Sequence, residues 1–227
     1  SPTLTLDPNI PPPNAGLGDT WLRPVDNMEM VFVPEGTFLM GSDPDVDALA
    51  EDDEFPQRLV FQSSFWIDQI EVTNAQFSAF LNSEGNQEEG GSSWFGLYGS
   101  GALIEFNGTS YLPKAGFANH PVNYVSWYGA AAYCTSVGGS LPTEAQWEYA
   151  ARGNDGRIYP WGNEAPTCDL AQFGGCGGGL VQVGSYSPAG DSWAGAADMA
   201  GNVWEWVADW YEADYYETGL TNNPGGP

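Results

Sequence analysis

Glycine and proline interrupt this chain so often that they limit the length of any helix or strand it can form. Its 227 residues include 30 glycines and 17 prolines, which favour turns and loops over the interiors of regular elements. Hydrophobic residues still make up 42% of the chain, enough for a packed core, and this excludes global disorder. A chain of this length is expected to form one domain around one sizeable core. We therefore predict an irregular, loop-rich α+β domain with few short helices and short strands.

Three segments carry the signals of short helices. Thr73 and Thr143 are each followed three residues later by glutamine, which is the pattern of a capping box. The segment 126–137 is apolar and is stopped by two glycines. The sequence therefore predicts helices after Thr73, over 126–137 and after Thr143, the last one ending at Gly153.

Short strands are predicted in two regions before the first helix. Residues 28–40 indicate two strands around a Pro-Glu-Gly turn, and residues 58–70 indicate another pair. After Tyr159 the chain is rich in loops, with two more short strands predicted at 181–186 and 202–210.

The first 27 residues differ in composition from the rest. They are rich in proline, with three consecutive prolines at 11–13, and this composition predicts an extended arm. We therefore divide the chain into an N-terminal arm, residues 1–27, and one domain, residues 28–227. Within the arm, Thr3–Leu6 alternates polar and apolar residues as a short strand would.

The charge balance is strongly acidic. Five basic residues stand against 30 acidic ones, a formal net charge of −25. Such a surface repels phosphate backbones, which excludes nucleic-acid binding, and it disfavours anionic membranes. No apolar run reaches transmembrane length, so we expect no membrane insertion. Cations are the natural partners of such a chain, because bound calcium would relieve the repulsion among its acidic side chains. The alternative explanation of the charge is solubility or a salty habitat.

The three cysteines indicate one disulfide. Cys168 and Cys176 flank a short glycine-rich stretch that can bring their Cα atoms within bonding range. Two thiols do not complete a zinc shell and no histidine lies near, so we favour a disulfide and an oxidising compartment: secreted, cell-surface or periplasmic. Cys134 lies in an apolar segment and is interpreted as a buried free thiol. Asn107 begins a glycosylation sequon.

Seven motifs occur in order along the chain. They are MVFVPEGTFLMGS, DEFP, FWIDQIEVTNAQFSAFL, HPVNYVSWYGAAAYC, LPTEAQWEYAARG, YPWGNE and DMAGNVWEWVADWY. Together they resemble the formylglycine-generating enzyme / sulfatase-modifying factor domain family, over residues 28–227. The resemblance implies a C-type-lectin-like fold that is heavily elaborated with loops.

The resemblance also implies a calcium site in the last motif. Its ligands would be the side chains of Asp198 and Glu205 and the backbone carbonyls of Gly201 and Val203, a set of hard oxygen donors that suits calcium. The alternative is that Asp198 caps a turn and Glu205 is solvated. The acidic segment 43–54 has carboxylates at EF-hand spacing, but it carries Ala48 where glycine is required, so we interpret it as a solvated turn.

The resemblance leaves more than one function open. Enzymes of the family oxidise a sulfatase cysteine to formylglycine with two copper-binding cysteines in an arginine-rich C-terminal segment, whereas other members are non-catalytic. This sequence ends at Pro227, before the expected place of that segment, and Cys134 matches a family cysteine outside the catalytic pair. We expect an extracellular, calcium-stabilised, non-catalytic module that binds a ligand or builds a surface assembly such as a fibre. The alternative is a copper-dependent formylglycine-generating oxidase whose catalytic segment is missing from this chain.

Two kinds of partner follow from the residues. Six aromatic side chains could line a groove for a carbohydrate or peptide, although such residues more often pack under loops. They are Trp94, Phe95, Tyr98, Tyr111, Tyr124 and Trp127. Thr3–Leu6 could add as a strand to a neighbouring copy of the chain, the other interpretation being a disordered linker. His120 is the only histidine, and no hydrolase triad can be built around it.

Overall fold

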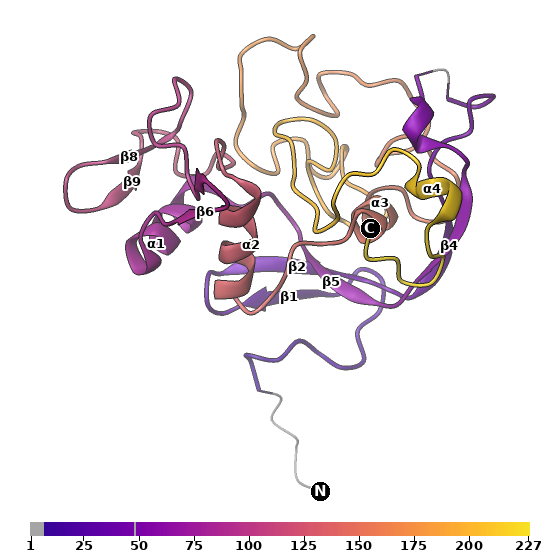
Figure 1. Ribbon diagram of the computed structural model, residues 1–227, viewed down its shortest axis with the longest axis horizontal. Coiled ribbons are helices and arrows are strands. Elements are labelled where there is room, and N and C mark those ends of the chain that lie inside the picture. The colour runs from indigo at the N-terminus through magenta and orange to yellow at the C-terminus, as the bar shows by residue number, and fades with distance from the viewer. Residues whose placement is uncertain (1–6, 48) are drawn as a thin grey trace, which may run out of the picture.

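The computed structural model describes residues 7–47 and 49–227 and is a mixed α/β fold of short elements joined by long loops (Figure 1). The helices are α1 Asn74–Glu84, α2 Trp127–Ser136, α3 Glu144–Arg152 and the short α4 Tyr215–Thr218, with a 3-10 turn at Asp52–Glu54. The strands are β1 Thr20–Arg23, β2 Met28–Val33, β3 Gly36–Met40, β4 Arg58–Gln62, β5 Phe65–Asp68, β6 Glu88–Glu89, β7 Ser92–Ser93, β8 Ile104–Phe106 and β9 Tyr111–Pro113. The irregular α+β class is confirmed.

The predicted helix starts are confirmed in detail. The Thr73 hydroxyl accepts the Gln76 amide at 3.2 Å, and the Gln76 side chain accepts the Thr73 amide at 3.0 Å. The same reciprocal pair caps α3 at Thr143. Each box satisfies backbone donors that would otherwise lack partners at a helix end. Gly153 ends α3 with a positive φ of 66°, as its lack of a Cβ allows.

The strands form small antiparallel sheets. The largest has the order β1-β2-β5, while β3 pairs with β4, β6 with β7 and β8 with β9. All four strands predicted between residues 28 and 70 are present. The two predicted at 181–186 and 202–210 are wrong, because turns and loops occupy both segments. In the second, Asn202 donates its amide to Gln172 in a neighbouring loop rather than to a sheet.

The domain begins earlier than its predicted boundary at residue 28. Thr20–Arg23 lies within the segment assigned to the arm, yet it forms β1 and pairs in register with β2, Thr20 opposite Val31. The residues before this four-residue strand are rich in proline, and that composition predicts an extended arm rather than a strand. Thr3–Leu6 lies outside the described residues.

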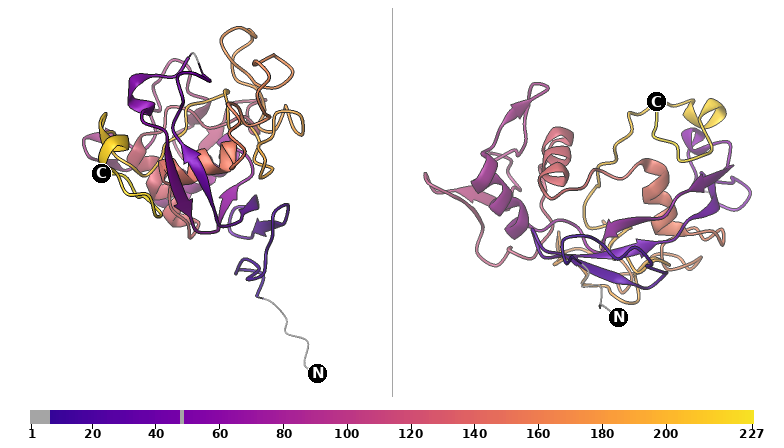
Figure 2. Two further views of the ribbon diagram at one scale, coloured as in Figure 1. Left: turned by 90° about the vertical axis from the view of Figure 1, so that its right-hand side faces the viewer. Right: turned by 90° about the horizontal axis from the view of Figure 1, so that it is seen from below.

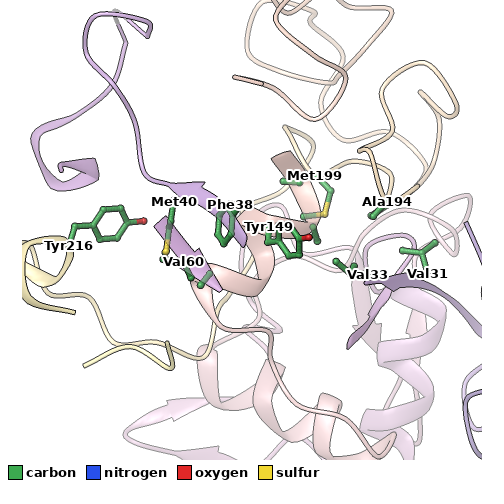
Figure 3. Close-up of a cluster of buried hydrophobic side chains, with 13 residues drawn as sticks. Val31, Val33, Phe38, Met40, Val60, Tyr149, Ala194, Met199 and Tyr216 are labelled. Carbon is green, nitrogen blue, oxygen red and sulfur yellow. The ribbon is translucent and has the colours of Figure 1, made fainter. Parts of the chain in front are cut away.

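The buried side chains form two clusters rather than the single core expected. One surrounds Tyr149 on α3, whose ring stacks on Phe38 at a centroid distance of 4.9 Å (Figure 3). The other joins Phe77 and Phe80 of α1 to Tyr133 of α2 and to Phe95, which is fully buried. In Figure 1, α1 and α2 lie with the small hairpins on one side, and α3 and α4 on the other. Among the described residues, no helix is long and apolar enough to span a membrane.

Candidate functional site

A groove of about 970 Å³ separates the two clusters. One wall comes from α2, through Ala130, Tyr133 and Cys134, and another comes from α3, through Trp147. The loop 197–206 completes the lining. Figure 2 (right) shows α2 and α3 standing on the same side of the strands. The groove surface is mostly apolar with a few charged groups, which is the usual character of a ligand site.

An ion network beside the groove joins the α2 wall to strands β1 and β5. Arg23 of β1 is buried and binds Asp26 at 2.6 Å and Asp68 of β5 at 2.9 Å. The Tyr133 hydroxyl of α2 donates to Asp26 at 2.8 Å. Burial pushes the pKa of Asp26 up, but the hydrogen bonds from Arg23 and Tyr133 outweigh it and the pKa is lowered. The network therefore holds β1, β5 and α2 in fixed positions around the groove.

Three carboxylates gather near one end of the groove. Glu71 and Asp198 are each only 8% exposed, whereas Glu205 lines the groove, surrounded by protein but open to solvent. Burial, and then the charges of Asp198 and Glu205, raises the pKa of Glu71 to about 9. Burial also raises the pKa of Glu205 to about 7 and raises that of Asp198. Such a group of carboxylates in a low-dielectric site favours either bound protons or a bound cation.

Glu71 has one hydrogen bond and one free oxygen. Asn202 donates from Nδ2 to Glu71 Oε2 at 2.9 Å, while Glu71 Oε1 is buried without a partner among the described residues. A buried acceptor without a partner is uncommon and calls for an explanation such as an ion. Glu71 is not among the site residues predicted from the sequence. The signal available was an acid between two apolar residues, Ile70 and Val72, shortly after the end of β5.

The turn from Asp198 to Glu205 is held by backbone geometry. Asp198 and Asn202 both have a φ of 57°, and Gly201 has a φ of 97°. A Cβ at Gly201 would collide with the carbonyl oxygen of Gln172, so only glycine fits there. Asn202 donates its amide to that same oxygen at 2.8 Å.

The Gln172 loop is closed by the predicted disulfide. Cys168 and Cys176 are bonded, with their Cα atoms 5.4 Å apart. Cys134 is the free thiol, as predicted, but it is half-buried rather than buried, and this partial burial raises its pKa to about 11. It lies on the groove wall, so this thiol stays protonated and weakly nucleophilic at neutral pH.

The structure brings the predicted calcium ligands only partly together. The charges of Asp198 and Glu205 both raise the pKa of Glu71. Each of the two already accepts a hydrogen bond, Asp198 from the Gly184 amide at 2.5 Å and Glu205 from Trp147 Nε1 at 2.5 Å. Within residues 7–47 and 49–227, no three His, Cys, Asp or Glu side chains are grouped as ligands of one metal ion. The donor chemistry nevertheless fits a hard cation, because carboxylate oxygens dominate and one of them lacks a partner.

Of the other candidates, Tyr124 lines the groove, whereas the acidic segment 43–54, His120 and Asn107 do not. The acidic segment 43–54 ends in the 3-10 turn, and its Ala48 lies outside the described residues. The backbone carbonyl of His120 accepts a hydrogen bond from the Asn74 backbone amide at 2.9 Å. Asn107 is exposed at the tip of the β8–β9 hairpin, where its side chain accepts the amides of Thr109 and Ser110.

Comparison with known proteins agrees with this architecture. Residues 19–226 match the model of the sulfatase-modifying factor enzyme 1-like domain. The chain is 38% identical to the formylglycine-generating enzyme of Thermomonospora curvata, over 83% of this chain and 74% of that protein. It is 33% identical to the Mus musculus formylglycine-generating enzyme, over 90% of this chain but only 64% of that protein. PvdO from Pseudomonas aeruginosa shares the fold, with a TM-score of 0.69 at 23% identity over 92% of this chain and 80% of PvdO. The chain therefore belongs to the sulfatase-modifying factor enzyme 1-like, or formylglycine-generating enzyme, family.

Proposed function

We propose that these 227 residues form a calcium-stabilised, extracytoplasmic binding module whose functional site is the groove between α2 and α3. The observation that carries this proposal is the groove itself. Its volume of about 970 Å³ is at the upper end of what single ligands occupy. The disulfide supports a secreted, cell-surface or periplasmic location.

The chemistry of the groove favours a peptide ligand that carries a basic side chain. The walls are mostly apolar, and three carboxylates line it: Asp68, Glu71 and Glu205. Arg23 offsets the charge of Asp68, whereas Glu71 and Glu205 have no basic partner in the described part of the chain. A cationic group on the ligand would compensate them, and the apolar walls would cover the rest of the peptide.

Calcium would sit at the end of the groove nearest the Asp198 turn. Asp198 and Glu205 would supply carboxylate oxygens, and Gly201 and Val203 would supply carbonyl oxygens. The bound ion would supply positive charge beside Glu71, whose pKa is raised by burial and by the charges of Asp198 and Glu205. Residues of this chain would hold the site in position. The disulfide loop fixes the Asp198 turn through the Gln172 carbonyl, which accepts the Asn202 amide, and the Asn202 side chain orients Glu71 by donating a hydrogen bond to it.

A groove-filling substitution tests the module. Ala130 lines the groove, whereas Ala131, one residue further along α2, lines a different cleft. Binding to an array of short synthetic peptides should favour basic peptides with apolar neighbours. Ala130→Trp should abolish that pattern and Ala131→Trp should retain it. Equal effects of the two variants, or no preference for basic peptides, would contradict the proposal.

The second candidate function is a copper-dependent oxidase that converts a sulfatase cysteine to formylglycine. The observation that favours it is the 38% identity to the Thermomonospora curvata enzyme. The observation against an oxidase is the state of Cys134, the free cysteine of this chain, because burial raises the pKa of its thiol to about 11. Incubation of this chain with copper and a cysteine-containing sulfatase peptide should give no aldehyde. Copper-dependent aldehyde formation would select the oxidase instead.

A further inference from the structure

A second cleft lies on the opposite face of α2 from the groove. It has a volume of about 500 Å³ and lies between α1, α2 and the β6–β7 hairpin. Four aromatic and two acidic side chains dominate its lining: Phe80, Glu84, Glu89, Trp94, Trp127 and Tyr128. We call this site the aromatic cleft. The α2 residues in it, such as Tyr128 and Ala131, differ from those in the groove, so the helix separates two independent sites.

The aromatic rings of the cleft are held in place. Trp94 stacks on Phe80 with 5.3 Å between ring centroids and 19° between planes. Trp127 donates from Nε1 to the Val207 carbonyl at 2.8 Å and stacks on Trp210 at 5.6 Å. These contacts restrain the rings before any ligand arrives, which lowers the ordering cost of binding.

The β6–β7 hairpin is fitted closely to α2. The ring of Tyr128 lies directly against Gly90, so that a Cβ at Gly90 would overlap it. Gly90 has a positive φ of 60° in the turn between the two strands. On the other side, Ala131 and Ala132 present only methyl groups. The hairpin therefore forms a fixed wall, and the small helix side chains leave the space open.

The charge of the cleft is negative and not compensated within it. Trp94 Nε1 donates to Glu89 Oε2 at 3.4 Å, which keeps that carboxylate beside the indole ring. No residue lining the cleft is basic. Three of the chain's arginines are in ion pairs elsewhere, and Arg58 lies over Tyr215 and Tyr216. Two carboxylates with no facing cation create a potential that attracts positive charge.

We propose that the aromatic cleft binds an organic cation, specifically an alkylated ammonium group. The faces of tryptophan and tyrosine attract such a cation through their ring quadrupoles, and the two glutamates add Coulomb attraction. A bare metal ion suits the cleft less well, because aromatic walls offer it no oxygen ligands. This inference does not depend on the proposed function of the groove, since it uses other residues.

Titration with tetramethylammonium chloride tests the proposal. Binding is followed by isothermal titration calorimetry and by the indole N–H signals of Trp94 and Trp127 in NMR spectra. Sodium chloride at equal ionic strength controls for general attraction to the acidic surface, and tert-butanol, a neutral molecule of similar shape, controls for apolar contact. A second arm uses a short peptide with trimethyllysine, which shows whether the cation is taken free or on a peptide.

Saturable tetramethylammonium binding is expected, with shifts of both indole signals. Glu89→Gln and Glu84→Gln should each weaken it by roughly fivefold, the equivalent of about 1 kcal/mol for a partly exposed charge. Glu88→Gln is the matched control, because Glu88 lies in the same strand but does not line the cleft. Ala131→Trp should block the cleft. Equal weakening by Glu88→Gln and Glu89→Gln, equal binding of tert-butanol, or the absence of saturation would each overturn the proposal.

Discussion

Replacing Arg23 by methionine should destabilise the whole domain, because this buried residue neutralises two carboxylates at once, one buried and one partly buried. Arg23 is 7% exposed and binds Asp26 at 2.6 Å and Asp68 at 2.9 Å. Methionine keeps much of the side-chain volume but leaves both carboxylates without a cation. Breaking a buried ion pair from one side costs about 3–5 kcal/mol.

The expected loss can be expressed as a melting temperature. For a domain of this size, 1 kcal/mol corresponds to a shift of about 2–4 °C, so Arg23→Met should lower Tm by about 6–20 °C. Differential scanning calorimetry measures this. Arg157→Met is the matched control, because Arg157 pairs with Asp155, whose side chain is 54% exposed, and an exposed pair contributes about 1 kcal/mol or less.

The comparison also tests where the domain begins. Arg23 belongs to β1, which the sequence assigns to an extended arm. If Arg23→Met and Arg157→Met lower Tm by the same small amount, then β1 is not part of the folded domain and the network does not join β1, β5 and α2.

Three further outcomes are expected. Replacing Cys168 and Cys176 together by serine opens a loop with a sequence separation of 8 and should cost about 2–3 kcal/mol, so an unchanged urea midpoint would argue against a structural disulfide. In EDTA, the free energy of unfolding should fall between pH 5 and pH 9. In the folded chain the pKa values of Glu205 and Glu71 are raised to about 7 and about 9. The stability that comes from their bound protons is therefore complete below about pH 4.5 and is lost as the pH rises through these raised pKa values. Glu71→Gln should flatten this pH dependence in urea unfolding, and a profile identical to that of the parent chain would contradict the assignment. Gly90→Ala should displace the β6–β7 hairpin from Tyr128 and weaken tetramethylammonium binding, whereas Gly91→Ala, which meets no neighbour, should change binding less.

The elements that could be predicted from the sequence are those specified by local chemistry. The capping boxes at Thr73 and Thr143 involve residues three apart, so the helix starts are readable without any tertiary contact. The strands at 28–40 and 58–70 show the expected apolar pattern between clear turns. The Cys168–Cys176 disulfide also spans a short loop.

The features that could not be predicted depend on contacts between distant residues. Glu71 becomes part of the acidic cluster through Asn202, 131 residues further along the chain. The segment 202–210 alternates apolar residues as a strand does, but Trp204 and Trp206 are 101% and 50% exposed in a loop. The two clusters of buried residues arise because a groove divides the interior, and no periodicity in the sequence signals a cavity.

Calcium titration of the whole chain tests the central claim most directly. In isothermal titration calorimetry at pH 7.5 after EDTA treatment and dialysis, the chain should bind one calcium ion, and calcium should raise Tm because it binds only the folded state. Asp198→Asn should weaken binding by at least tenfold, while Glu105→Gln, an exposed acid on β8, should leave it unchanged. No heat of binding with an unchanged Tm at millimolar calcium, or equal affinity in Asp198→Asn, would contradict a calcium-stabilised module.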